Sequence, residues 1–210
     1  MERPTKEHIR QLPLFRGIEL ASIVVIKNKQ EAQKAINELK NHKTLGFDTE
    51  SKPCFQKGEI STGPHLIQLA TASKAFLFPT RFPAAVEQLD AILSDPHITK
   101  VGFGLAGDEK GLRTKLGIQL VNSKNLATKL GSFFGFERPV GLKVAVAMML
   151  KLRLTKRAQL SNWAIFPLRE DQLRYAANDA YASLCIEFAL QEALQSGEVR
   201  EVIALGQELQ

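Results

Sequence analysis

The chain has 210 residues, of which 44% are hydrophobic, and its formal net charge is +6. This length and composition favour one ordinary globular domain with a buried core. No apolar run approaches the ~18 residues of a membrane-spanning helix, and the two cysteines form no CxxC pair, so we expect no membrane segment, disulfide framework or structural zinc site.

Residues 1–21 are expected to form an N-terminal arm. The arm is charged from its second residue and lacks the apolar centre of a secretory signal. We therefore expect a cytoplasmic protein, free or associated with the nucleoid or with RNA.

Strands dominate the first half of the chain after this arm. Ser22 to Ile26 has the β-branched content of a strand, and Lys29 to Leu39 carries apolar residues at helical spacing. Three further strands are expected, and they could form a meander: Thr44–Glu50, Leu66–Ala70 and Ala75–Phe78.

Helices dominate the second half. A helix is expected from Pro83 to Leu93, a strand from Lys100 to Gly104 and a helix from Asp108 to Leu116. Further helices are expected over Lys124–Phe134, Leu142–Leu150 and Glu170–Ser196. With no repeat or linker to divide the chain, this order predicts a single α/β domain over residues 1–210, with a central mixed sheet flanked by helices.

Positive charge is concentrated between Lys110 and Arg169. This segment holds twelve lysines and arginines and one carboxylate, Glu137, so its net charge is +11 and that of the remainder is −5. Such a surface attracts polyanions, because lysine and arginine displace counterions from phosphates. A solvated basic face without a partner would give the same pattern.

The first acidic motif is Asp48-Thr-Glu50. Carboxylates two apart in a strand project from the same side of the sheet, and they repel each other unless a cation lies between them. The alternative is a strand that ends at Asp48, so that both acids face water.

The second motif leads from a strand through Gly102, Gly104 and Gly107 to Asp108. An aspartate near a helix N-terminus can also be only a cap. The glycines resemble a phosphate loop, but their place in the chain is wrong for dinucleotide binding, so we expect no organic cofactor.

The third motif is Tyr175-Ala-Ala-Asn-Asp179. Tyr175 and Asp179 are four residues apart and share one face of the last helix. A partly buried tyrosine beside a solvated aspartate would show the same spacing.

Together the three motifs resemble those of the DEDD exonuclease superfamily, over about residues 44–190. Leu66-Ile-Gln-Leu-Ala70 and Ser161-Asn-Trp163 are also similar to segments of that family. Its sister subgroup has a histidine five positions before the last aspartate, where this chain has Arg174. The chain therefore resembles the tyrosine subgroup, which includes ribonuclease D and the Werner syndrome exonuclease domain.

The resemblance implies a ribonuclease H-like fold and a 3′–5′ exonuclease that releases nucleoside 5′-monophosphates from the free 3′ end of DNA or RNA, single-stranded or frayed. Two Mg²⁺ or Mn²⁺ ions would be held by four carboxylates. Asp48 would bridge both ions, Glu50 and Asp179 would bind the ion that holds the attacking water, and Asp108 would bind the other. Tyr175 would orient that water. Candidate substrate contacts are Thr49, Leu66, Lys156, Arg157 and Trp163, although Trp163 could equally be core.

Two positions depart from the family pattern. Ser51 stands where many relatives have tryptophan, and Asn125 lies in a region where relatives often have aspartate. We expect these departures to affect substrate handling and not chemistry.

Two other hypotheses are compatible with the sequence: a nucleic-acid-binding module without turnover, and a different α/β enzyme such as a phosphatase.

Overall fold

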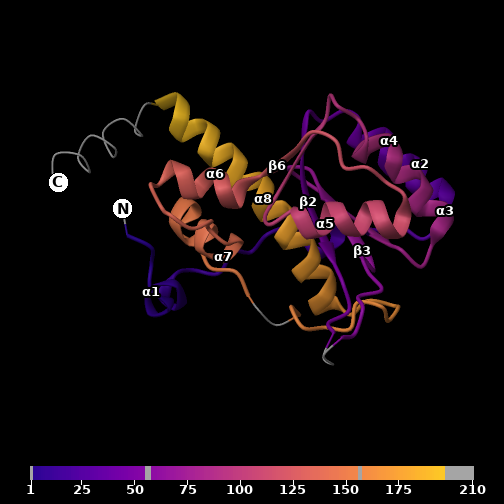
Figure 1. Ribbon diagram of the computed structural model, residues 1–210, viewed down its shortest axis with the longest axis horizontal. Coiled ribbons are helices and arrows are strands. Elements are labelled where there is room, and N and C mark those ends of the chain that lie inside the picture. The colour runs from indigo at the N-terminus through magenta and orange to yellow at the C-terminus, as the bar shows by residue number, and fades with distance from the viewer. Residues whose placement is uncertain (1, 55–57, 156–157, 197–210) are drawn as a thin grey trace.

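The computed structural model describes residues 2–54, 58–155 and 158–196, and it is built on a six-stranded sheet with helices on both faces (Figure 1). The strands are β1 (Ile23–Val25), β2 (Thr44–Glu50), β3 (Leu66–Ala70), β4 (Ala75–Pro79), β5 (Thr99–Gly102) and β6 (Ser123–Asn125). Their order across the sheet is β1-β4-β3-β2-β5-β6. The expected meander of β2, β3 and β4 is antiparallel, whereas β1, β5 and β6 pair in parallel with β4, β2 and β5. The predicted mixed sheet is confirmed.

Helices form about half of the described chain and connect or cover these strands. The α-helices are α1 (Lys6–Gln11), α2 (Lys29–Leu39), α3 (Pro83–Val86), α4 (Asp90–Leu93), α5 (Ala106–Gly111), α6 (Leu126–Phe133), α7 (Leu142–Ala145) and α8 (Glu170–Ser196). Short 3₁₀ segments are η1 (Leu20–Ser22) and η2 (Glu87–Leu89), and π-helical segments are η3 (Leu112–Leu116) and η4 (Val146–Leu150). None of the described helices is both long and apolar enough to cross a membrane.

Side chains of β2 alternate between the two layers of the fold, as the period of a strand requires. Leu45 and Phe47 join a core with Ile36 of α2 on one face. Gly46 faces α8 on the other, and so do Asp48 and Glu50, which follow it at intervals of two. The long helix α8 packs against β2, β3 and β4, with α6 and α7 beside it (Figure 1).

The N-terminal arm is packed against this framework and is not extended throughout. It contains α1, where Thr5 caps the helix by accepting from the amide of His8. Phe15 and Arg153 join the arm to the segment after η4 through a backbone hydrogen bond of 2.9 Å. The amide of Ile18 donates to Asn178 Oδ1 at 3.2 Å. This bond connects the arm to the third motif.

Several element boundaries differ from those expected. The helix predicted from Lys124 begins at Leu126, because Asn125 is its cap and accepts from the amide of Ala127 at 3.1 Å. The residues before it pair with β5 as β6, a strand that the sequence did not reveal. β5 ends at Gly102 and not at Gly104, since Gly104 has a positive φ of 70° and turns the chain into α5.

Candidate active site

Three carboxylates meet on the sheet face that α8 covers. Asp48 and Glu50 project from the end of β2, and Asp179 projects from α8. One oxygen of each carboxylate lies within 4.8 Å of the corresponding oxygens of the other two. The first and third acidic motifs, far apart in the sequence, therefore form one cluster.

The absence of a side chain at Gly46 lets α8 approach β2 closely enough for this meeting. A Cβ at Gly46 would lie 2.0 Å from the carbonyl oxygen of Ala180, the residue after Asp179. Because no real Cβ makes so short a contact, any larger residue would push the helix away from the strand. Gly46 thus sets the distance between the two elements that carry the carboxylates.

The cluster is electrostatically unfavourable as long as its charges are unbalanced. Burial, and after it the charge of Asp179, raises the pKa of Glu50 to about 8. Burial likewise raises the pKa of Asp48, with Asp179, Glu50 and Asp108 adding to the effect. Burial raises the pKa of Asp179 to about 6, although a hydrogen bond from Tyr175 and the charge of Lys143 oppose the rise. Without a cation, these carboxyl groups bind protons more tightly than isolated ones do.

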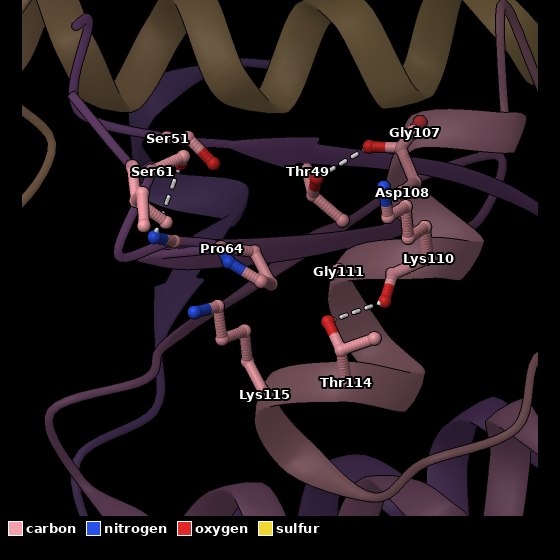
Figure 2. Close-up of a pocket in the computed structure, with 12 residues that line it drawn as sticks. Thr49, Ser51, Ser61, Pro64, Gly107, Asp108, Lys110, Gly111, Thr114 and Lys115 are labelled. Carbon is pink, nitrogen blue, oxygen red and sulfur yellow. Dashed lines mark hydrogen bonds between the residues drawn. The ribbon is translucent and has the colours of Figure 1, made fainter. Parts of the chain in front are cut away.

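Asp108 lies next to this cluster but outside its closest group. It is the third residue of α5, and its carboxylate accepts a hydrogen bond from the hydroxyl of Thr49, on the strand between Asp48 and Glu50 (Figure 2). Its charge raises the pKa values of both Asp48 and Glu50, so the four carboxylates interact. Burial raises the pKa of Asp108 itself, and the Thr49 hydrogen bond lowers it.

Tyr175 lies one helical turn before Asp179 and is hydrogen-bonded to it. Only 7% of Tyr175 is exposed, and its ring packs against that of Trp163 with the centroids 6.0 Å apart. Burial, and after it the charges of Asp179 and Glu50, raises the pKa of Tyr175 above its usual range. The phenol is therefore a hydrogen-bond donor at any physiological pH.

The donor set fits a hard divalent cation. The cluster offers carboxylate oxygens alone, which Mg²⁺, Mn²⁺ and Ca²⁺ prefer over nitrogen or sulfur. A further polar group on the same face also lacks a partner: Gln68 of β3 is fully buried directly opposite Asp48, and neither atom of its amide is hydrogen-bonded. Gln68 was not among the predicted site residues, although it is the single polar residue of the apolar strand Leu66–Ala70.

A cavity of about 610 Å³ opens beside Asp108, on the side of β2 that carries Thr49 (Figure 2). The strand and the following loop supply Thr49, Ser51 and Pro64 to one wall, and α5 and η3 supply Lys110 and Lys115 to the other. Both lysines are exposed. Neither forms an ion pair with any residue that the structure describes. We refer to this cavity as the lysine groove.

The remaining predicted site residues have different surroundings. Leu66 and Trp163 are buried together in one hydrophobic cluster with Tyr175, and both border a smaller cavity of about 170 Å³. Trp163 thus packs against Tyr175. A direct contact of Leu66 or Trp163 with the substrate stays a prediction. Lys156 and Arg157 lie outside the described residues.

Lys143 of α7 is one of the twelve cations between Lys110 and Arg169, and nothing in the sequence distinguishes it from the others. Its charge lowers the pKa of Asp179, and its ammonium donates to Gln159 Oε1 at 3.1 Å. A cation close to the acidic cluster could not have been located from spacing, because α7 reaches α8 only through tertiary packing.

Fold and site together define a ribonuclease H-like α/β protein with an acidic centre suited to divalent cations. The chain belongs to the family of 3′-5′ exonucleases, whose model matches residues 23–195. Members of this family use divalent metal ions. The expected relationship to the DEDD exonucleases is confirmed.

Individual relatives agree with this assignment. The chain is 30% identical to a "3'-5' exonuclease" of Arabidopsis thaliana, covering 66% of this chain and 49% of that protein. It is 31% identical to the bifunctional 3'-5' exonuclease/ATP-dependent helicase WRN of Mus musculus, covering 77% of this chain and 12% of that protein. The chain therefore spans half or less of these relatives.

Among solved structures, ribonuclease D of Trypanosoma brucei in complex with RNA U12 has a similar fold, with a TM-score of 0.73 and 20% identity. The alignment covers 88% of this chain and 64% of that one. At this identity the likeness supports the fold.

Proposed function

We propose that this chain is a metal-dependent 3′–5′ exonuclease that hydrolyses phosphodiester bonds of DNA, RNA or both and releases nucleoside 5′-monophosphates. The observation that carries the proposal is the convergence of Asp48, Glu50 and Asp179 within 4.8 Å, with Asp108 beside them. Family membership supports the same activity.

Two divalent ions, Mg²⁺ or Mn²⁺, fit the four carboxylates. Asp48 would be shared between them, Glu50 and Asp179 would hold one, and Asp108 the other. What such ions supply when bound is a lower pKa of the attacking water and stabilisation of the leaving oxygen. The raised pKa values of Asp48 and Glu50 support this assignment, because a cation would remove the repulsion that raises them.

Tyr175 would position the attacking water by its hydroxyl. The raised pKa of Tyr175 makes it a poor general base, so its part is to hold and orient. Asp179 fixes the hydroxyl through the hydrogen bond between the two side chains. The ring of Trp163 packs against that of Tyr175 and limits its movement.

The substrate strand would enter along the lysine groove. Its two lysines lie on the wall next to Asp108, and their ammonium groups suit phosphates on the 5′ side of the scissile bond. The RNA in the ribonuclease D complex supports a nucleic-acid substrate. Thr49, which borders the groove and lies between Asp48 and Glu50 in β2, would contact the 3′ end of that substrate. No organic cofactor is needed for this hydrolysis.

The activity is tested with matched DNA and RNA oligonucleotides, single- and double-stranded, in Mg²⁺ and in Mn²⁺. With a 5′ label, wild type should give a ladder shortened from the 3′ end on at least one substrate. Asp48→Ala should shorten none of them. Equal activity of the two proteins would refute the proposal, and binding without any shortening by wild type would favour a module without turnover.

A further inference from the structure

Gln68 occupies a place in the sheet that an apolar residue would be expected to fill. It pairs directly with Asp48 across the antiparallel strands β2 and β3, so the two side chains share a face with their Cβ atoms about 4.5–5.5 Å apart. Its exposed fraction is 0%, and neither its amide nitrogen nor its amide oxygen has a hydrogen-bond partner.

The surroundings of Gln68 limit where a partner can come from. Its neighbour on the other side of the strand pair is Leu77 of β4, which belongs to an apolar cluster with Leu66 and Ala176. The carboxylate of Asp48 is the polar group on the opposite, cross-strand side. A buried amide without a partner is destabilising, so a partner is expected in the working state of the site.

We propose that Gln68 is a positioning residue for the metal ligand Asp48, donating from its side-chain amide to the Asp48 carboxylate when a divalent cation is bound. The inference rests on the proposed metal-dependent function. Ligating carboxylates are commonly held by such an outer hydrogen bond, whose loss weakens metal binding.

A contrast between stability and metal binding separates this role from plain packing. Gln68→Met keeps the length of the side chain and removes both unpartnered atoms. In the metal-free protein, held in chelator, the melting temperature should therefore stay unchanged or rise. Calorimetric titration with Mn²⁺ should show about tenfold weaker binding or more, together with a smaller rise of the melting temperature at saturating Mn²⁺.

Gln172 provides a matched control. It is also a buried glutamine with an unpartnered amide nitrogen, but its carbonyl accepts from the amide of Arg169 at 3.1 Å at the start of α8. Gln172→Met should lower the metal-free melting temperature and leave the Mn²⁺ affinity within about twofold of wild type. Gln68→Leu replaces Gln68→Met if the latter does not fold.

Weaker Mn²⁺ binding by Gln68→Met at unchanged or higher metal-free stability supports the inference. Mn²⁺ binding equal to that of wild type, or a loss of metal-free stability as large as that of Gln172→Met, overturns it. If wild type itself binds no Mn²⁺, the metal site and the proposed function fail together with the inference, and that result is distinguishable from the others.

Discussion

The hydroxyl of Thr49 donates a hydrogen bond to the carboxylate of Asp108, and so links β2 to the first turn of α5. Thr49 lies on the face of β2 opposite to Asp48 and Glu50, so the bond reaches around the edge of the strand that carries the cluster. It joins the second acidic motif to the first, and it favours the ionised form of Asp108.

Replacement of Thr49 should therefore weaken catalysis without removing a ligand. Thr49→Val keeps the shape and loses the donor, which raises the pKa of Asp108 further and frees its carboxylate to turn. A hydrogen bond to a charged group contributes about 1.5–3 kcal/mol, so kcat should fall roughly tenfold or more, most strongly at acidic pH. Measurement of kcat between pH 6 and 9 checks this. Thr49→Ser should remain close to wild type, and full activity of Thr49→Val would contradict the role.

Tyr175→Phe should retain a small fraction of the activity, about 0.1–1%, which is the usual effect of losing one positioned hydrogen bond at a reacting group. The profile of kcat against pH should keep its shape, because a tyrosine whose pKa lies above its usual range does not titrate in the assay. Loss in the variant of an alkaline titration that wild type shows would contradict this and identify Tyr175 as a base.

The raised pKa of Glu50 predicts how the metal-free protein responds to pH. In the unfolded chain this group titrates near its ordinary value of 4.5, and in the folded chain at about 8. Between these values the native state binds more protons than the unfolded state, so the contribution of Glu50 to stability falls as pH rises through this range and is constant outside it. Glu50→Gln removes that loss.

Thermal unfolding in chelator should therefore show nearly equal melting temperatures for wild type and Glu50→Gln at pH 4.5. At pH 8.5 the variant should be higher by ~2 °C or more, since about 1 kcal/mol corresponds to ~2–4 °C in a chain of this size. The exposed Glu87 of η2 supplies a control, and Glu87→Gln should follow wild type at both pH values. A difference between wild type and Glu50→Gln that does not change with pH would contradict the burial of this charge.

The lysine groove predicts a loss of substrate affinity at unchanged chemistry. Lys110→Ala combined with Lys115→Ala should raise KM for an oligonucleotide and reduce the slope of log KM against log salt, while kcat changes by less than about twofold. Lys34→Ala, on the exposed face of α2, is the control and should alter neither. A salt dependence unchanged in the double variant would exclude the groove as the path of the strand.

Much of the fold follows from local patterns in the sequence. β2, β3 and α8 have the bounds expected from the sequence: β2 and β3 are apolar runs bounded by polar or turn-forming residues, and α8 carries apolar residues at helical spacing. β6 was missed because its three residues carry no strand pattern, and pairing with β5 alone creates it. α1 in the N-terminal arm buries no residue, so no apolar periodicity marks it.

The site likewise contains residues that the sequence predicts and residues that it does not. Strand and helix spacing placed Asp48 with Glu50, and Tyr175 with Asp179, on one face each, but it was the resemblance of the motifs to those of the DEDD exonucleases that predicted one shared cluster. Three features depend on packing between elements that are distant in the chain. They are the unpartnered amide of Gln68, the position of Lys143 near Asp179 and the groove beside Asp108. No local pattern records such contacts.

Titration of Mn²⁺ into the chelator-treated protein at pH 7 tests the central claim most directly. Wild type should bind Mn²⁺ and release protons on binding, because Glu50, with a pKa of about 8, is largely protonated at this pH and must ionise to bind a metal. Calorimetry in two buffers of different ionisation enthalpy measures that release, and Asp48→Asn should bind at least about tenfold more weakly. Equal Mn²⁺ binding by wild type and Asp48→Asn would contradict a metal centre built on these carboxylates.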